Sequence, residues 1–389
     1  MRILLLALAI AVGQLATSLY LPSLPAMAHE FGVGPAAATW TLTAFYIGFA
    51  LCNLVAGPLA DAKGRLPVLF GGLAIYVAGS VLCATASSIT LFILGRLIQA
   101  AGTSAPPVVA RAMLRDGQSE GTGTQAMIWI SIAMAASPAL GPPLGGLIQQ
   151  TLGWRWAFLS LAAAGTLILA AATLLLEETL RPTARTRATG LVRRYLALLT
   201  DAIYCRHVGA LSCLFAGLGV FFATGPFLFI QMLGLSPIAY GLLNVVNVAG
   251  YLGGSALASR LARHLPAPAL VRIGTLIALV GGIAMAALAA AGIFATWSIL
   301  GPVAILTLGF GIVLPAGTAA ALDRHPAQAG LASAMLGFIQ VAAAAAGTAI
   351  AGIMLGHGVL PVACVFFALT AAAAWLAHGL HPTTGPVPA

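Results

Sequence analysis

The sequence predicts an all-α integral membrane protein in which 12 transmembrane helices form two pseudo-symmetric six-helix bundles. Three observations support this fold class. The chain is 61% hydrophobic and only 6% charged, whereas soluble domains are roughly 45–50% apolar and about 25% charged. Long uncharged runs occur along its whole length, and its two halves share a short repeated pattern. The composition therefore excludes a soluble globular domain, and the hydrophobicity excludes intrinsic disorder.

Runs without a charged residue define the expected helices, because a charged side chain is costly in hydrocarbon. A membrane-spanning helix needs about 20 residues. Four runs supply one span each: 3–28, 31–60, 121–154 and 156–176. Four longer runs supply two spans each, which brings the total to 12: 66–110, 207–259, 273–323 and 325–389. The paired runs are expected to break at 86–88, at 234–237, near 301–302 or slightly before it, and at 356–358. These runs are too long and too rich in alanine for barrel strands.

The basic residues are distributed very unevenly between the expected loops. With the N-terminus inside, the cytoplasmic segments carry 15 of the 17 basic residues, the outer loops carry Arg155, and Arg96 stays within a span. The positive-inside rule therefore predicts cytoplasmic termini.

The net charge of +9 does not indicate nucleic acid binding, because the basic residues are interspersed among apolar runs. The first run ends in Ala26-Met27-Ala28 like a signal peptide, but its length favours a retained helix.

One long polar stretch, 177–206, separates an N-terminal bundle (1–176) from a C-terminal bundle with a short cytoplasmic tail (207–389). Apolar residues at helical spacing lie beside Arg193 and Arg194, which suits a short helix on the anionic inner leaflet. These apolar residues are Leu191, Val192, Tyr195, Leu196, Leu199 and Ile203. A disordered basic linker is the alternative.

The two halves resemble each other in the loop that follows their second helix. At a constant offset of 198 residues, Leu59, Asp61 and Arg65 correspond to Leu257, Ser259 and Arg263. Many secondary transporters are built from such repeats and bind their substrate near the midplane between them. The repeat therefore favours a transporter with six helices in each half.

Several motifs together resemble those of the major facilitator superfamily. The loop after helix two contains Gly57-x-Leu59-x-Asp61-x-x-Gly64-Arg65, and helix four contains Leu94-Gly95-Arg96-Leu97-Ile98-Gln99. Helix five contains Gly141-Pro142-x-x-Gly145-Gly146. The last pair of motifs is Leu19-Tyr20-Leu21-Pro22 in helix one and Gly153-Trp154-Arg155-Trp156 before helix six. The helix-five motif resembles the antiporter motif of exporters. The last pair resembles the bicyclomycin/chloramphenicol-resistance branch of drug:proton antiporters. This resemblance implies a monomeric efflux transporter of the bacterial inner membrane that exchanges small amphipathic compounds for protons.

Three positions depart from the pattern of that branch. Ser18 stands where an acidic residue is usual in helix one, Ala62 where a basic residue is usual in the signature loop, and Ser137 where the antiporter motif usually has its first glycine. The sequence therefore has no carboxylate at mid-membrane depth. Proton coupling would run through Asp61 or Glu30 at the helix ends, or transport would be uncoupled.

The signature loop contains a charge at the expected cytoplasmic end of helix two. Gly64 permits a tight turn there. The Asp61 carboxylate can cap a neighbouring helix or pair with Arg115, as a latch that favours the outward-facing state. A solvated loop charge of little energetic value is the alternative.

Arg96 is the single charge expected deep in the membrane, where an unpaired guanidinium costs roughly 2.5–3.5 kcal/mol. It must therefore face the bundle interior, with Gln99 and Thr103 on the same helical face. Its partners are expected to be carbonyls, hydroxyls, water or the substrate, because all eight acidic residues lie at helix ends or in loops. A purely structural bond to the backbone of helix one is the alternative.

Small and polar residues complete the candidate site. The glycines and proline of the helix-five motif let helices bend and approach closely: Gly141, Pro142, Gly145 and Gly146. They either seal the domain interface of an antiporter or serve only in helix packing. Polar and aromatic side chains at helical spacing mark the expected substrate cavity: Gln14, Tyr46, Asn53, Gln99, Phe222, Gln231, Asn244, Asn247 and Gln340. Buried amides suit a neutral or amphipathic ligand, although a single one is more often a helix–helix hydrogen bond.

The leading functional prediction is a multidrug or small-molecule efflux transporter working by alternating access. Export or uptake of a specific metabolite, such as a sugar or amino-acid derivative, is the alternative. An intramembrane enzyme would need paired acids, a Ser/His pair or a metal site within a span, and the sequence places none there. The five cysteines are scattered and the seven histidines fall at helix ends or loops, so no metal or cofactor is expected.

Overall fold

The computed structural model describes residues 2–116, 122–180 and 190–380, with the side chains of 2, 115–136 and 327 left out. Within these ranges every regular element is a helix. The N-terminal helices are α1 (Arg2–Ser18), α2 (Leu24–Glu30), α3 (Pro35–Lys63), α4 (Arg65–Thr85), α5 (Ile89–Thr103), α6 (Ala105–Asp116), α7 (Thr122–Thr151) and α8 (Trp154–Leu175). The later helices are α9 (Leu191–Leu198), α10 (Ala202–Pro226), α11 (Pro237–Leu261), α12 (Ala267–Ala290), α13 (Thr296–Asp323), α14 (Ala329–Leu355) and α15 (Val359–His378).

Ten helical segments of the described chain are long and apolar enough to cross a membrane. Two of them combine elements, since α1 continues through the 3₁₀ turn Leu21–Ser23 into α2, and α10 continues into the π-helical segment Phe227–Met232. The fourth and fifth predicted spans correspond to α5 with α6 and to α7. The fold class is confirmed, and these segments are consistent with 12 predicted spans.

The breaks between helices follow local chemistry. The α4–α5 break falls at 86–88, as predicted, and Ser88 caps α5 by accepting a hydrogen bond from the Leu91 N–H at 3.3 Å. The break expected near 301–302 or slightly before it lies at 291–295, and Pro302 is accommodated inside α13. The fourth predicted span is split at Ser104, because Pro106 and Pro107 fall in the first turn of α6, where a missing N–H is tolerated.

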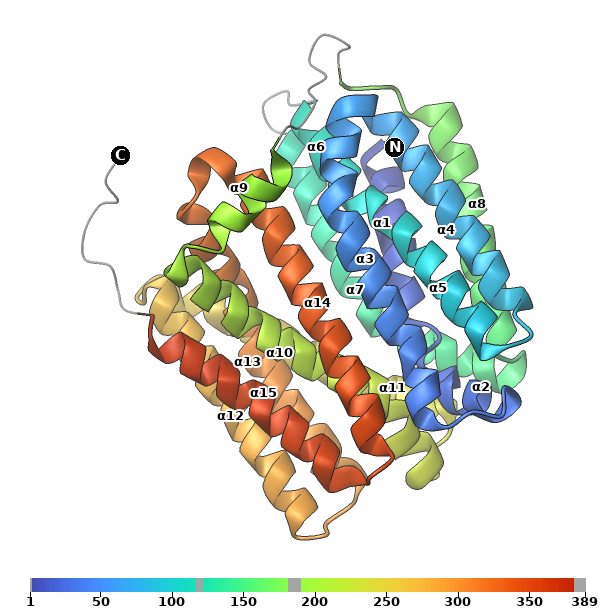
Figure 1. Ribbon diagram of the computed structural model, residues 1–389, viewed down its shortest axis with the longest axis vertical. Helices are drawn as coiled ribbons and strands as arrows, with labels where there is room; N and C mark the ends of the chain where they lie inside the picture. Colours follow the sequence, from blue (N-terminus) through green and yellow to red (C-terminus); the bar gives the residue numbers. More distant parts are fainter. Residues whose placement is uncertain (1, 117–121, 181–189, 381–389) are drawn as a thin grey trace. The chain divides into compact units, whose positions relative to one another are not determined.

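The chain forms two compact units (Figure 1). Unit 1 comprises Met1–Thr189 and Phe222–Val245, and unit 2 comprises Gly190–Phe221 and Val246–Ala389. In unit 1, α4 packs against α5 and α8, and α1 packs against α7. In unit 2, α12 packs against both α13 and α15. The six-plus-six domain division of the sequence stays a prediction.

Glycines let the central helices of each unit approach closely. A Cβ added to Gly79 of α4 would lie 2.3 Å from the Gln99 backbone nitrogen on α5. A Cβ added to Gly309 of α13 would lie 2.3 Å from the Gly274 carbonyl oxygen on α12. Small residues at such contacts bring backbones together and favour van der Waals packing in lipid. The third and fourth helices of each half therefore use the same packing device.

Candidate functional site

Arg96 on α5 lies at the centre of unit 1 and is fully buried. Its Nη1 donates hydrogen bonds to the Ala16 carbonyl oxygen on α1 at 2.9 Å and to Gln99 Oε1 at 2.5 Å. The guanidinium lies 4.3 Å from the ring centroids of both Tyr20 and Phe45. Aromatic faces stabilise a cation through their quadrupole, most strongly where the cation is desolvated. The bundle thus holds the charge with two carbonyl-type acceptors and two rings.

The orientation of Gln99 is fixed by a second hydrogen bond. Its Nε2 donates to Ser80 Oγ at 2.8 Å, which leaves Oε1 to face Arg96. Thr103, expected beside Arg96, donates instead to the Gln99 carbonyl oxygen at 2.8 Å. The Gln99 side chain therefore stabilises the buried guanidinium of Arg96 within unit 1.

Two donors of Arg96 remain available. Its Nε and Nη2 have no hydrogen-bond partner in the structure, although both are buried. A buried donor without an acceptor costs about 1–3 kcal/mol, and such exceptions in a native fold call for a water, an ion or a ligand. Arg96 is therefore both a structural residue, bound to the helix-one backbone, and a candidate for polar recognition.

An aromatic column extends from Arg96 toward the C-terminal end of α2 and the N-terminal end of α8. The Tyr20 and Phe158 ring centroids lie 5.6 Å apart, those of Phe158 and Phe92 lie 5.1 Å apart, and those of Phe92 and Trp154 lie 5.6 Å apart. Packed aromatic pairs of this kind add roughly 0.5–1.5 kcal/mol each. The helix-one, helix-four and helix-six motifs, separate in the sequence, therefore converge in one cluster.

An ion pair closes the end of this column. Glu30 accepts hydrogen bonds from Trp154 Nε1 at 2.6 Å and from Arg155 Nη1. Arg155 also donates to the Ala86 carbonyl oxygen at 3.2 Å and stacks 4.2 Å above the Trp154 ring. Sequence reasoning named Glu30 and Arg155 separately but gave no signal that they meet across 125 residues.

The signature loop turns sharply between α3 and α4. Gly64 has a φ of 107°, a backbone conformation that favours glycine. Asp61 pairs with Arg65 Nη1 at 2.5 Å, one helical turn later. The alternative partner considered for Asp61, Arg115, has its side chain outside the described residues. A Cβ added to Gly57 would lie 3.6 Å from Val108 Cγ1 of α6, which is an ordinary van der Waals distance.

A residue that the sequence did not single out clamps this loop. Glu178, just after α8, accepts hydrogen bonds from the backbone N–H groups of Arg65 and Leu66, each at 3.1 Å, at the start of α4. Partial burial raises the pKa of Glu178, but hydrogen bonds from four backbone N–H groups bring that pKa below its ordinary value. The carboxylate is therefore charged at neutral pH, and its clamp is lost only as pH falls through the lowered pKa.

We expect Asp61→Asn to reduce transport about tenfold, equivalent to about 1.4 kcal/mol in the balance between conformational states. Stability should change little, because Asp61 is 48% exposed and asparagine keeps an oxygen that can accept a hydrogen bond from Arg65, whose side chain is 9% exposed. Initial transport rates and thermal unfolding of purified protein would check this. Asp323→Asn, at the exposed end of α13, is the matched control. Parental transport by the Asp61 variant would contradict a latch.

The antiporter-type motif packs α7 tightly against helix one. A Cβ on Gly145 would lie 1.6 Å from the Leu19 carbonyl oxygen, and a Cβ on Gly141 would lie 2.0 Å from Ser18 Oγ. Ser18 donates a hydrogen bond to the Ser137 carbonyl oxygen at 3.3 Å. The position where an acid was expected is thus a packed seam between α1 and α7.

The same face of α7 contacts the start of α11 within unit 1. A Cβ on Gly146 would lie 2.3 Å from the Pro237 carbonyl oxygen. A Cβ on Gly241 would lie 2.4 Å from the carbonyl oxygen of Pro142. Both contacts are backbone to backbone, so neither can relax by a side-chain movement.

The expected cavity residues fall in both units. Gln14, Tyr46, Asn53, Gln99, Phe222, Gln231 and Asn244 belong to unit 1, and Asn247 and Gln340 belong to unit 2. Asn244 Nδ2 donates to the Tyr240 carbonyl oxygen at 2.9 Å, while Asn244 Oδ1 has no hydrogen-bond partner. Asn247 is buried, and neither its Nδ2 nor its Oδ1 has a partner. These orphaned amides make α11 a candidate ligand-contacting helix.

Comparison with known proteins gives a consistent result. The chain is 28% identical over 338 residues to multidrug resistance protein D of Escherichia coli, covering 87% of this chain and 85% of that protein. It is 31% identical over 309 residues to a chloramphenicol resistance protein of Pseudomonas aeruginosa, covering 77% and 71%. A crystal structure of a D-xylose-proton symporter shares the fold, with a TM-score of 0.78, 16% identity and coverage of 98% and 97%.

The family assignment rests on most of the chain. Residues 6–351 match the family described as Major Facilitator Superfamily. The predicted resemblance is confirmed, and the protein is a multi-pass membrane transporter rather than an enzyme. Within the described residues, no group of three or more His, Cys, Asp or Glu side chains could hold a metal ion. The chain belongs to the major facilitator superfamily of transporters.

Proposed function

We propose that the protein exports small uncharged or amphipathic compounds across the bacterial inner membrane in exchange for protons. One observation carries the direction of transport. The glycine motif of α7 packs directly on Ser18 and Leu19, which builds the seam that the resemblance associates with exporters. The fold alone does not decide direction, because a proton symporter shares it. The names of the resistance proteins among the relatives support efflux.

The distribution of charge supports an uncharged or amphipathic substrate. The seven acidic residues of the described ranges lie at helix ends or between helices, so the described spans offer no counter-charge to an organic cation. Arg96 is a buried positive charge with two unused donors. Hydroxyl, carbonyl or amide groups on a substrate would suit these donors, whereas a cation would be repelled.

Alternating access would expose the substrate site to each side in turn, by rocking of the two halves. We infer that both termini and α9 are cytoplasmic and that residues 31–35 are external, as the basic residues predict. A membrane-impermeant thiol reagent should then label Val33→Cys but not Thr200→Cys in intact cells. Labelling of the second variant from outside would reverse the orientation.

Proton coupling would use the carboxylates at the two ends of unit 1. Asp61 and Glu30 are 48% and 43% exposed, and each pairs with an arginine. Protonation would release that arginine and so change the balance between states. This arrangement replaces the intramembrane acid that the position of Ser18 lacks.

We expect Ser18→Asp to increase the dependence of transport on the pH gradient, because it restores a titratable group within the membrane. Ser18→Asn is the matched control, since it crowds Gly141 to the same extent without titrating. Transport by both variants should be compared at several gradients. If the aspartate and asparagine variants respond alike, helix one is not where coupling is decided.

The efflux function itself is tested in a deletion strain. Loss of the protein should increase susceptibility to uncharged amphipathic compounds and leave susceptibility to organic cations unchanged. Metabolite profiles of the same strain serve as the second arm. Accumulation of one cellular metabolite, with unchanged susceptibility to every compound, would assign a specific metabolite exporter instead.

A further inference from the structure

Helix α9 presents a stripe of uncovered apolar side chains. Val192, Leu196 and Leu199 are 72%, 57% and 42% exposed. They are spaced by four and three residues, so they share one helical face. Arg193 and Arg194 are both exposed, and Arg193 lies at the edge of the stripe, about 100° around the helix from Val192. An apolar stripe beside arginines is typical of helices that lie in a membrane interface.

The opposite side of α9 is held against unit 2. Leu198 is 2% exposed, and α9 packs against α14. Backbone hydrogen bonds continue past the helix end, from Thr200 N–H to the Ala197 carbonyl oxygen and from Asp201 N–H to the Leu198 carbonyl oxygen, each at 3.3 Å. The turn between α9 and α10 is therefore a fixed connection, and the uncovered stripe has a defined direction relative to unit 2.

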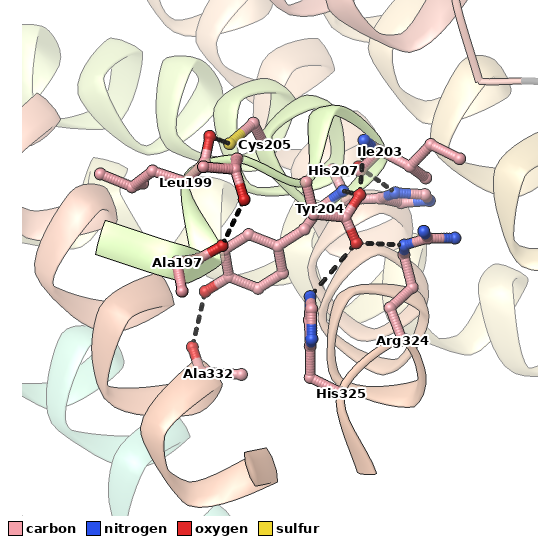
Figure 2. A network of polar contacts seen from close by, with 11 residues as sticks. Ala197, Leu199, Ile203, Tyr204, Cys205, His207, Arg324, His325 and Ala332 are labelled. Carbon is pink, nitrogen blue, oxygen red and sulfur yellow. Dashed lines mark hydrogen bonds and ion pairs between the residues drawn. The ribbon is translucent and has the colours of Figure 1, made fainter. Parts of the chain in front are cut away.

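Asp201 joins this turn to α10 and to the end of α13, and the neighbouring Tyr204 contacts α14; Figure 2 shows the partners Arg324, His325, Tyr204 and Ala332. Its Oδ1 caps α10 by accepting the Ile203 and Tyr204 N–H groups at 2.9 and 3.2 Å. Its Oδ2 accepts a hydrogen bond from Arg324 Nε at 2.7 Å and lies 3.2 Å from His325 Nε2. The Tyr204 hydroxyl donates to the Ala332 carbonyl oxygen of α14 at 2.7 Å.

Asp201 is ionised under physiological conditions. Partial burial raises its pKa, but the Arg324 hydrogen bond and the two backbone N–H groups bring that pKa below its ordinary value. The junction is therefore intact at neutral pH and is lost only as pH falls through the lowered pKa. This carboxylate therefore links the α9–α10 turn to the start of α10 and the end of α13, while α14 is contacted by the Tyr204 hydroxyl and by α9 directly.

The charge around the stripe identifies what covers it. Between Glu178 and Asp201 the chain carries five arginines and no acidic residue. A surface with a high density of negative charge and an apolar layer beneath it complements both features, and the cytoplasmic leaflet offers both in its anionic phospholipids. A protein partner or another part of this chain would need to supply a matching acidic and apolar groove.

We propose that α9 is a docking surface for anionic phospholipids, and that Asp201 transmits this docking to the cytoplasmic ends of α10 and α13. The proposal uses the cytoplasmic placement of α9 inferred above. Docking buries Val192, Leu196 and Leu199 below the headgroups and pairs Arg193, at the edge of the stripe, with a phosphodiester, while Arg194 adds to the positive charge near the surface. The cytoplasmic end of unit 2 is then more ordered in an acidic membrane than in a neutral one.

Amide hydrogen exchange tests this in the full chain. The protein is reconstituted in nanodiscs of phosphatidylcholine alone or with phosphatidylglycerol at about one lipid in three, a composition chosen to give a negative surface potential. Exchange at residues 192–200 should be slowed by at least about fivefold in the acidic discs, and high salt should remove the effect by screening. Residues 203–206 and 322–325 should also be slowed, but not in Asp201→Asn, which keeps a helix-capping side chain without its charge.

A pair of variants separates specific docking from general charge. Arg193→Gln with Arg194→Gln should abolish the lipid dependence. The control variant Arg260→Gln with Arg263→Gln removes the same amount of charge from two exposed arginines, one in the last turn of α11 and one just after this helix. It should leave the lipid dependence of exchange intact. Equal exchange in both lipids, or equal loss in the control pair, overturns the proposal. Strong protection in neutral discs means that another part of the chain covers α9, which also overturns it. The measurement needs no transported compound, so its failure is distinct from failure of the efflux function.

Discussion

Gly145→Ala should abolish transport, because the added methyl group meets backbone atoms rather than the end of a flexible side chain. The added Cβ would lie 1.6 Å from the Leu19 carbonyl oxygen, so α1 and α7 must move apart. Both sides of the contact are backbone, and overpacking of this kind typically costs about 1–3 kcal/mol or more. Thermal unfolding and initial transport rates of the purified variant would measure the loss.

The chain provides matched controls for this substitution. Gly71 of α4 and Gly301 of α13 have no heavy atom within 4 Å of the corresponding Cβ position. Alanine at either site should be tolerated, and its higher helix propensity favours the fold by up to about 1 kcal/mol. Parental activity in Gly145→Ala would show that the α1–α7 seam is not as close as described.

Arg96→Ala should eliminate transport, and Arg96→Lys should retain only a small part of it. Removing the guanidinium leaves Gln99 Oε1 without its donor and empties the space between Tyr20 and Phe45. An unsatisfied buried polar group costs about 1–3 kcal/mol. Lysine keeps the charge, but an ammonium cannot reproduce the planar fork that serves several acceptors while stacking on two rings. Transport rates at matched membrane content would check both variants.

Arg155→Lys serves as the comparison for the lysine variant. Arg155 also stacks on an aromatic ring and also pairs with an acceptor, but its side chain is 41% exposed. Solvent can replace what lysine fails to supply there, so most of the activity should remain. If Arg96→Lys transports as well as the parent, a point charge is sufficient at the centre of unit 1.

Much of the fold was predictable because it depends on local composition. Uncharged runs and small-residue breaks predicted the helices, including the α4–α5 and α14–α15 breaks. The position of Arg96 inside the bundle followed from the cost of an exposed guanidinium in lipid. The π-helical segment Phe227–Met232 and the split at Ser104 were not predicted. Both depend on how neighbouring helices satisfy backbone groups near prolines, which no local pattern records.

The contacts that organise the site were less predictable, because they join distant parts of the chain. Glu178 accepts a hydrogen bond from the start of α4, 113 residues away in the sequence. The only sequence signal for this contact was the position of Glu178 just after the last apolar run of the N-terminal half. The meeting of Glu30 with Trp154 is similarly remote. Hydrogen bonds of this kind follow from tertiary packing, whereas spacing along the sequence reports only neighbours on one helix.

The central claim is proton-driven export, and transport into inside-out membrane vesicles tests it most directly. An uncharged amphipathic compound should accumulate in vesicles whose lumen is acidic, and an uncoupler should release it. Vesicles containing the Arg96→Ala variant at equal abundance should accumulate none. Accumulation that is unchanged when the pH gradient is collapsed would contradict proton exchange, and absence of accumulation for every compound in a broad panel would contradict export.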